Sequence, residues 1–268
     1  YGGSRQLLRR SAGLATSSPM RATASPPQYR DADRLTLKLS IVLPVLNEAP
    51  RLQATLQALA ALRQRGCEVI VVDGGSSDGT LNVAQPFADR VIVAARGRAS
   101  QQNAGAQVAH HEALLFLHAD TQLPADADRL ILDALSKGAD WGRFDVCFGD
   151  PGGEVGRLPA MLNVIAFMMN WRSRVTGIAT GDQCLFFTRA AFERTGGFPM
   201  QPLMEDIELS RRLKKVSPPA CLRDRVTTSP RRWLRHGVWR TILLMWWLRL
   251  AYWLGVSPVR LARWYGYK

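Results

Sequence analysis

From residue 35 onward, short apolar runs alternate with longer stretches in which apolar residues recur at helical spacing. The short runs, rich in Val, Ile, Leu and Phe, predict β-strands at 39–46, 68–72, 90–94, 113–117, 143–148 and 184–188. The helical spacing predicts helices at 51–62, 79–87, 100–110, 158–171, 205–215 and 233–254. This alternation is typical of the α/β class, in which helices flank a doubly wound, mostly parallel sheet.

Composition and charge divide the chain into three parts. Residues 1–34 are rich in Ser, Ala, Arg and Pro without periodicity, which predicts a disordered segment. Residues 35–230 predict one α/β domain, and residues 231–268 a basic, Trp-rich helical segment. The net charge of +13 lies at the ends, because residues 1–34 carry +4, residues 225–268 carry +9 and the rest is neutral. A nucleic-acid enzyme more usually has a basic stripe across its body, so we expect no nucleic-acid partner.

The four cysteines lie far apart and form no C-x-x-C pair. This excludes a zinc ribbon and a disulfide scaffold, and it favours a reducing compartment. Hydrophobic residues make up 47% of the chain and charged residues 21%, the balance of a globular domain. We therefore expect a cytoplasmic globular protein.

Polar side chains follow three of the predicted strands at the point where each strand ends. Residues 47–48 follow the first strand, 73–80 the second and 118–120 the fourth. Ligands of open α/β sheets bind outside the carboxyl ends of the strands. Asp73 can accept a hydrogen bond from a base or a ribose, the glycines after it allow close backbone approach, and Asp120 is a hard oxygen ligand. This rim is expected to bind a nucleotide diphosphate with Mg²⁺ or Mn²⁺.

Each of these residues also has a purely structural interpretation. Asn47 can cap a helix, Asp78 can form a turn, and Asp120 can cap the next helix. Their gathering on one edge favours the binding site. Arg98, at a predicted helix N-terminus, is placed to contact a base or a phosphate.

Seven segments, in their order along the chain, resemble glycosyltransferase family 2, whose members have the GT-A fold. The segments are I-V-L-P-V-L-N-E (41–48), V-D-G-G-S-S-D-G-T (72–80), G-R-A-x-Q-x-N-x-G (97–105), H-A-D-T-Q-L-P (118–124), G-D-Q (181–183), G-G-F-P (196–199) and M-E-D-I-E-L-S-R-R-L (204–213). The nearest subset is that of the short bacterial radical-SAM/selenodomain-associated transferases.

The rim and the resemblance together assign candidate roles to individual residues. Asp120 matches the last Asp of the metal-binding D-x-D motif, and Asp206 matches the general base that deprotonates the acceptor, with Glu205 beside it. Two positions depart from the common pattern, because Gly74 replaces a second Asp and His118 replaces the first Asp of D-x-D. Asp120 is therefore expected to be the main protein ligand of the metal. The candidate nucleotide-binding residues are Pro44, Asn47, Glu48, Asp73, Gly75, Asp78 and Arg98.

The remaining candidates lie later in the chain. Residues 181–183 precede a strand and are expected to line the sugar and acceptor side, and the acids at 205–206 can also simply favour a helix start. His236 is a candidate metal ligand, because a late His binds the metal in some GT-A enzymes. The two arginines at 231–232 are expected at a diphosphate or a lipid phosphate, or at a solvated edge. The candidate substrate-binding residues are Gly181, Asp182, Gln183, Arg231 and Arg232.

Six of the eight Trp lie in residues 229–268, around the apolar stretch 238–256. Arg240 and Arg249 interrupt this stretch on opposite sides of a helix, and a central Arg costs about 2.5–3.5 kcal/mol in a membrane span. We therefore expect a hydrophobic, amphipathic helix that lies on an anionic membrane surface. Packing on the domain or on a second subunit is the alternative. The apolar stretch 158–169 shares that surface or belongs to the core.

The resemblance implies an inverting, metal-assisted glycosyltransferase that moves a sugar from a UDP- or GDP-sugar to an acceptor the sequence does not name. The basic C-terminus favours a lipid-linked acceptor at the inner face of the cell membrane. Two other classes stay open: a nucleotidyltransferase on a related sheet and a non-catalytic, membrane-peripheral scaffold. The former typically has a Gly-rich loop after its first strand, and residues 46–50 contain no glycine.

Overall fold

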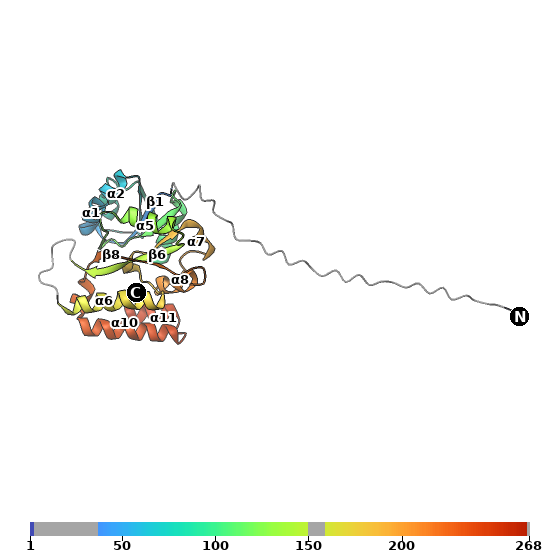
Figure 1. Ribbon diagram of the computed structural model, residues 1–268. Helices are drawn as coiled ribbons and strands as arrows, with labels where there is room; N and C mark the ends of the chain where they lie inside the picture. The colour runs from blue at the N-terminus through green and yellow to red at the C-terminus, as the bar shows by residue number, and fades with distance from the viewer. Residues whose placement is uncertain (3–36, 150–158, 267–268) are drawn as a thin grey trace.

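A computed structural model of the chain describes residues 1–2, 37–149 and 159–266. The predicted disordered segment at 1–34 lies almost wholly outside these residues. Within them, the strands form one sheet in the order β3-β2-β1-β4-β7-β6-β8-β5, with helices on both faces (Figure 1). The predicted α/β class with a mostly parallel sheet is confirmed.

The first half of the domain builds the parallel part of the sheet. Its strands are β1 (Leu39–Val45), β2 (Glu68–Asp73), β3 (Arg90–Val93) and β4 (Ala113–Phe116), and the pairings among these four are parallel. The helices between them are α1 (Ala49–Ala58), α2 (Ala60–Gln64), α3 (Thr80–Ala84) and α4 (Arg98–Val108). All four carboxyl ends therefore lie on one edge of the sheet, where the sequence placed the polar rim.

The second half adds four strands in mixed directions. They are β5 (Thr121–Gln122), β6 (Trp141–Phe148), β7 (Phe186–Thr188) and β8 (Ala220–Thr228). β7 runs antiparallel to β4 and β6, and β8 runs parallel to β6. The helices of this half are α5 (Ala127–Ser136), α6 (Met161–Thr176), α7 (Arg189–Arg194), α8 (Glu205–Leu213), α9 (Arg231–His236), α10 (Val238–Trp253) and α11 (Pro258–Tyr265).

Alternating side chains of β1 reach two separate cores. Ile41 and Leu43 pack with Leu52 of α1 on one face, while Val42 packs with Ala106 of α4 on the other. A strand that is buried on both faces has an almost continuous run of apolar residues, which is why these strands were easily predicted. The two cores hold the rim between rigid layers.

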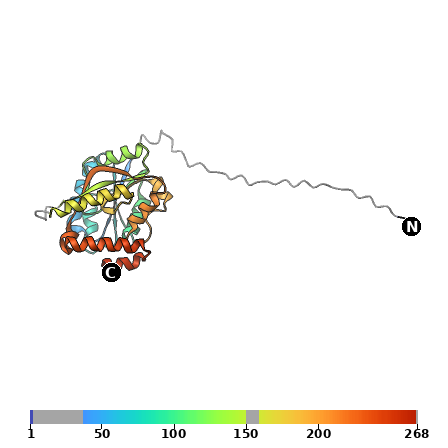
Figure 2. The same cartoon turned by 60° about the horizontal axis from the view of Figure 1, so that its bottom comes forward.

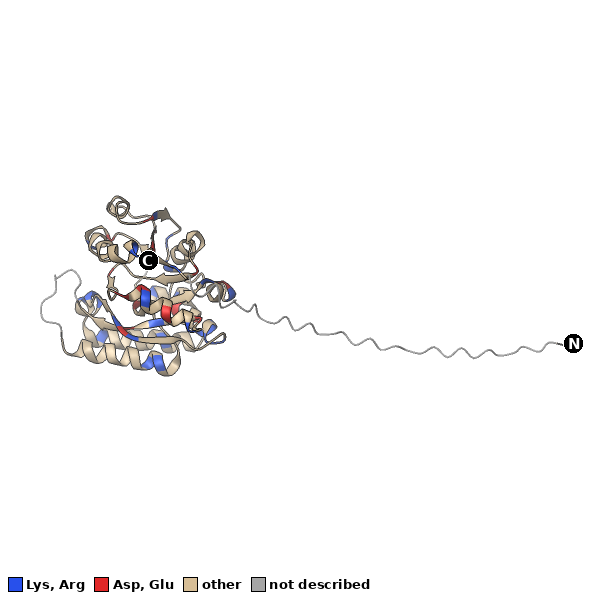
Figure 3. Ribbon diagram, turned by 45° about the horizontal axis from the view of Figure 1, so that its top comes forward, with Lys and Arg blue, Asp and Glu red and all other residues tan. Residues whose placement is uncertain are grey.

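The C-terminal helices cover the lower part of the molecule (Figure 2). α10 and α11 bury Leu248 and Leu261 fully against Leu203 and Met204, which directly precede α8. The first residues of α10 pack with α6 through Leu162 and its neighbours. One face of the C-terminal segment therefore packs on the α/β domain, which was the alternative to a position on the membrane surface. Figure 3 shows Arg and no acid along these helices, as the acid-free sequence 225–268 requires.

One predicted helix is divided in the structure, and several elements of the structure were not predicted. The helix expected at 233–254 is two helices, because Gly237 breaks it with a φ of 81°. The strand β8 was not predicted, and its burial explains why: its residues 220–225 are half-buried or exposed, so it lacks an apolar run. The elements β5, α5, α7 and α11 were also not predicted.

Candidate active site

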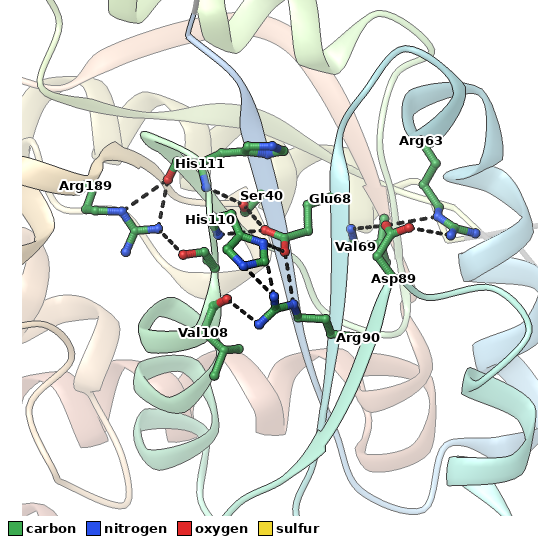
Figure 4. Close-up of polar contacts among 11 residues, drawn as sticks. Ser40, Arg63, Glu68, Val69, Asp89, Arg90, Val108, His110, His111 and Arg189 are labelled. Atoms are coloured by element: carbon green, nitrogen blue, oxygen red, sulfur yellow. Dashed lines mark hydrogen bonds and ion pairs between the residues drawn. The ribbon is translucent and has the colours of Figure 1, made fainter.

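A polar cluster at the amino ends of the strands marks the edge opposite the rim (Figure 4). Glu68 accepts hydrogen bonds from the Ser40 hydroxyl at 2.5 Å and the His110 backbone N–H at 2.9 Å, and its carboxylate lies 3.4 Å from Nε of Arg90. Burial alone raises the pKa of Glu68, but these hydrogen bonds outweigh it and the pKa is lowered. Glu68 is paired with three neighbouring residues, so this cluster ties the starts of the strands together.

The loops after β1 and β2 are joined to each other at the rim. The Asn47 N–H donates to Oγ of Ser76 at 2.8 Å, and the Ser77 N–H donates back to Oδ1 of Asn47 at 2.9 Å. Asp78 accepts from the Ala49 N–H at 3.1 Å. Asp78 also accepts from the Thr80 N–H at 3.1 Å, which is the turn role that the sequence left open, whereas Asn47 joins the two loops and does not cap α1, whose N-cap is Glu48. Their contact with a nucleotide stays a prediction.

Asp73 shapes the loop that follows β2. It is fully buried, and its Oδ2 accepts from the N–H groups of Gly75 and Ser76 at 2.9 and 2.8 Å. Gly75 adopts a φ of 89°, which favours glycine. The carboxylate therefore holds the loop, and nucleotide contact by Asp73 stays a prediction. Pro44 lies within β1, opposite Val72 of β2.

α4 supplies two residues that the sequence analysis missed. Its first residue is Arg98, at the helix start where it was expected. The buried Gln101 donates from Nε2 to the carbonyls of Val45 and Val72, both at 2.8 Å, and thereby clamps the ends of β1 and β2. Asn103 bonds the Phe198 backbone in both directions, at 2.8 and 2.9 Å. The side chains of Gln101 and Asn103 in the segment 97–105 thus have structural roles.

Gly181 brings the two halves of the rim together. Its N–H donates to Oδ2 of Asp206 at 2.8 Å. A Cβ on Gly181 would lie 2.6 Å from the His118 ring and 3.9 Å from Asp206. Gly181 therefore lies between His118, which follows β4, and Asp206, the candidate base on α8. A larger residue at this position would clash with the ring of His118.

The acid pair at the start of α8 is electrostatically unusual. Glu205 is 5% exposed, and burial together with the charge of Asp206 raises its pKa to about 7. Asp206 is half-buried, and its Oδ1 accepts from the Ile207 N–H at 2.7 Å. Met204, just before the pair, has a φ of 66°. Glu205 is therefore partly protonated near neutral pH.

Backbone strain gathers at the same edge. Within the described residues, the non-glycine residues with positive φ are Asn47 at 54°, Cys184 at 48° and Met204 at 66°. They follow β1, follow residues 181–183 and precede α8, respectively. Strained backbone that persists at one place is typical of functional sites. This observation supports the rim as the active site without reference to any motif.

Asp120 is held by a cation from the C-terminal segment. Nη2 of Arg231 lies 3.3 Å from Oδ2 of Asp120 and 3.8 Å from Oε2 of Glu48. Burial raises the pKa of Glu48, while Arg231 opposes that shift. Nε of Arg231 is buried without a hydrogen-bond partner among the described residues. Arg231 therefore joins the ends of β1 and β4 and retains a donor for a further anion.

The other candidate residues for the metal and the substrate, His118, His236 and Arg232, do not contact Asp120 as Arg231 does. Nδ1 of His118 lies 3.4 Å from Asp182, whose pKa burial would raise but the hydrogen bond and charge of His118 lower. His236 is exposed at the end of α9. Arg232 stacks 3.5 Å from the ring centre of Tyr265 in α11. Among the described residues, no three His, Cys, Asp or Glu side chains lie close enough together to hold a metal alone.

Gln183 requires a correction. Its side chain is fully buried, and Nε2 donates to Oγ of Ser173 at 3.0 Å and Oδ1 of Asn170 at 3.4 Å. The expectation that this side chain lines the substrate is not met, because it faces α6. Gly181 and Asp182, by contrast, lie at the rim, and their substrate contacts stay predictions.

A mostly parallel sheet whose carboxyl edge gathers acids, with arginines from the starts of α4 and α9, is the arrangement of a GT-A type domain. The family profile described as Glycosyl transferase family 2 matches residues 40–195, and the chain belongs to this family.

Two solved structures show the same fold. The fragment 1–349 of TarS from S. aureus, in complex with UDP-GlcNAc, has a TM-score of 0.56 at 16% identity, over 72% of this chain and 58% of that chain. Glucosyl-3-phosphoglycerate synthase from Mycobacterium tuberculosis, in complex with Mn²⁺, UDP and glucosyl-3-phosphoglycerate, has a TM-score of 0.53 at 18% identity and covers 77% of each chain. At these identities the likeness concerns the fold.

Curated relatives match over shorter stretches. A PGL/p-HBAD biosynthesis glycosyltransferase from Mycobacterium bovis is 39% identical over 98 residues, 34% of this chain and 38% of its own. The succinoglycan biosynthesis protein ExoA from Rhizobium meliloti is 34% identical over 125 residues, 41% of this chain and 36% of its own. The chain thus spans well under half the length of these relatives.

Proposed function

We propose that this chain is an inverting glycosyltransferase that uses a UDP- or GDP-sugar and glycosylates a hydroxyl of a lipid-linked acceptor at the inner face of the cell membrane. The observation that carries the proposal is the position of Asp206, one glycine away from His118 at the end of β4. This places a carboxylate beside the segment that holds Asp120. Within the family, membership in the radical-SAM/selenodomain-associated subset stays a prediction from the sequence motifs.

Asp206 would take the proton of the acceptor hydroxyl. Both of its oxygens accept a backbone N–H, from Gly181 and Ile207, which fixes the orientation of the carboxylate. Burial and the charge of Asp206 raise the pKa of the neighbouring Glu205 to about 7. The hydroxyl then attacks the anomeric carbon opposite the leaving diphosphate, and a single displacement inverts the configuration.

The surroundings of Asp120 suit a divalent metal ion that takes most of its ligands from water and from the diphosphate of the sugar nucleotide. Mg²⁺ usually keeps several waters and binds one or two carboxylates together with substrate phosphates, so one Asp and no three-residue cluster suits it. Asp120 would hold Mg²⁺ or Mn²⁺, with His118 and His236 as further candidate ligands. Such an ion supplies charge neutralisation for the leaving diphosphate. The unpartnered Nε of Arg231 is available to a diphosphate oxygen.

A thermal-shift panel of UDP- and GDP-sugars, with and without Mn²⁺, tests the donor site. A donor at about 100 times its Kd stabilises the native state by about 2.7 kcal/mol, a midpoint rise of roughly 5–10 °C. We expect one nucleotide class to produce this rise and Mn²⁺ to enlarge it. Asp120→Ala should remove the Mn²⁺ effect, whereas Asp126→Ala, an exposed acid on the same segment, should keep it. A panel without any shift, as a non-catalytic scaffold predicts, overturns the proposal.

The membrane part of the proposal rests on a broad apolar surface. α6 exposes Phe167 and Trp171, and α10 and α11 expose further large apolar side chains, namely Trp239, Leu243, Trp246, Trp247, Leu250, Trp253, Val259 and Trp264. Exposed arginines accompany them, at positions 235, 240, 260 and 263. Trp and Arg together favour the headgroup region of an anionic bilayer. No helix within the described residues is long and apolar enough to cross a bilayer.

Sedimentation with vesicles of phosphatidylglycerol tests this surface. The protein should pellet with these vesicles. Less protein should pellet at high salt, because the electrostatic attraction of each basic residue to the anionic surface contributes about 1 kcal/mol to binding, and salt screens it. The double variant Trp239→Ser/Trp253→Ser removes two of the most exposed rings and should weaken binding at least about tenfold. The control Val93→Ser/Met200→Ser removes exposed apolar side chains from outside this surface. Equal binding by both double variants contradicts the assignment.

A further inference from the structure

Two arginines that the sequence analysis did not single out as ligands lie under the apolar surface. Arg172 of α6 and Arg249 of α10 line an open cleft of about 660 Å³ together with Leu243, Trp246, Trp247 and Leu250. Nε and Nη2 of Arg172 are buried without any hydrogen-bond partner in the part of the chain that the structure describes. Buried donors of a charged group are normally paired, so the missing partner points to a ligand.

The two guanidinium groups repel each other. Burial, and after it the charge of Arg249, lowers the pKa of Arg172 to about 10, and burial lowers the pKa of Arg249 as well. The nearby carboxylate of Asp206 attracts both arginines, and Asp182 also attracts Arg249. Arg143 repels Arg172 as well, although Arg143 is itself paired with Asp145. An anion in the cleft would reduce the repulsion between the two guanidinium groups and pair the free donors of Arg172.

The cleft combines this charge with an apolar lining. Its leucines and tryptophans are about half exposed or more, and Trp247 rests on Trp264 of α11 with ring centres 6.2 Å apart. A free inorganic anion would gain nothing from such a lining. A molecule with an apolar chain next to an anionic group would cover the rings and pair the arginines at once. Guanidinium forks bind phosphate oxygens in a bidentate manner.

We propose that Arg172 and Arg249 bind the phosphate that joins the apolar chain of the acceptor to its hydroxyl-bearing head, with the chain lying in the cleft beside them. The inference deepens the proposed function and rests on it, because it takes Asp206 as the base that meets that hydroxyl. It explains why the two cations lie within the electrostatic reach of Asp206. The acceptor class is thus a phosphate-linked amphiphile.

Dodecyl phosphate, used below its micelle concentration, probes this site without requiring activity. Titrated into the full-length protein, it should change the Trp fluorescence in a saturable way, because Trp246 and Trp247 line the cleft. Dodecyl maltoside offers the chain without the charge, and inorganic phosphate offers the charge without the chain. Both should require concentrations at least about tenfold higher.

Arg172→Gln and Arg249→Gln should each weaken dodecyl phosphate binding by about 10- to 100-fold, the loss of a charge-assisted contact. Arg223→Gln, on an exposed part of β8 away from the cleft lining, removes one positive charge as a control and should bind normally. Arg172→Gln should also raise the thermal midpoint without ligand, because it removes a buried like charge. This second readout separates a folded variant from a damaged one.

The outcomes distinguish this inference from the proposed function. Unchanged dodecyl phosphate binding in both variants overturns the inference, as does equal binding of dodecyl maltoside or of inorganic phosphate by the wild type. Donor binding is measured on the same samples by thermal shift. A wild type that binds a sugar nucleotide but not dodecyl phosphate retains the proposed function and loses the inference. One that binds dodecyl phosphate but no sugar nucleotide loses the proposed function and the role of the site in an acceptor.

Discussion

Asp206→Asn is expected to bind the sugar nucleotide as the wild type does and to transfer sugar about 10²–10⁴-fold more slowly. The substitution keeps the size of the side chain but removes the proton acceptor. One hydrogen bond is also lost, because the Asn side chain has a single acceptor oxygen for the two N–H groups of Gly181 and Ile207. The measurements are initial transfer rates and the thermal shift produced by the donor.

Glu208→Gln is the matched control for this variant, because it neutralises an acid on the same helix that pairs with Arg211 and Arg212. It should leave the transfer rate within about twofold of the wild type. A parallel fall of donor affinity and transfer in Asp206→Asn would mean that the residue supports the fold of the rim. In that case the base must be sought elsewhere.

Deletion of residues 231–268 is expected to abolish cooperative folding of what remains. Leu248 and Leu261 are fully buried, and they cover Leu203 and Met204 immediately before the acid pair. Each large apolar side chain so buried contributes about 1.5–3 kcal/mol. The loss also uncovers Leu162 and Ile165 of α6, so the total approaches the 5–15 kcal/mol that stabilises a typical domain.

Thermal unfolding followed by circular dichroism tests this deletion. The full-length variant Trp253→Ser is the control, because its side chain is largely exposed and its loss should leave the midpoint nearly unchanged. A truncated chain that unfolds cooperatively at the wild-type midpoint would show that 35–230 is an independent domain, as the sequence division suggested. The packing of α10 and α11 predicts the opposite.

The parallel half of the sheet could be predicted because its strands are buried on both faces. β1 and β2 are nearly continuous apolar runs, and each ends in polar residues that mark the rim. β8 carries the opposite signal, since its exposed residues 223–225 are all charged. Its pairing with β6 arises from tertiary contacts, which a single sequence does not display.

The candidate site was predictable only as far as residues lie next to strand ends. Asp120 and His118 follow β4 directly, and Asp206 was found through a motif. Arg172 had no such signal, because it lies on a helix whose other residues are mostly apolar, and its partner Arg249 is 77 positions away. Gln101 was missed because its role, the clamping of two carbonyls, exists only once β1 and β2 are side by side.

The contact of Arg231 with Asp120 and Glu48 bears on how the protein responds to ionic strength. One guanidinium shared by two carboxylates leaves this corner with a single net negative charge. A sugar diphosphate that enters with a divalent ion brings little net charge, so loading the donor is an exchange of counter-ions and depends weakly on salt. The arginines at 235, 240, 260 and 263 are exposed, so salt should screen their attraction to anions directly. Binding of the donor and the proposed attachment to a membrane are therefore expected to depend differently on salt.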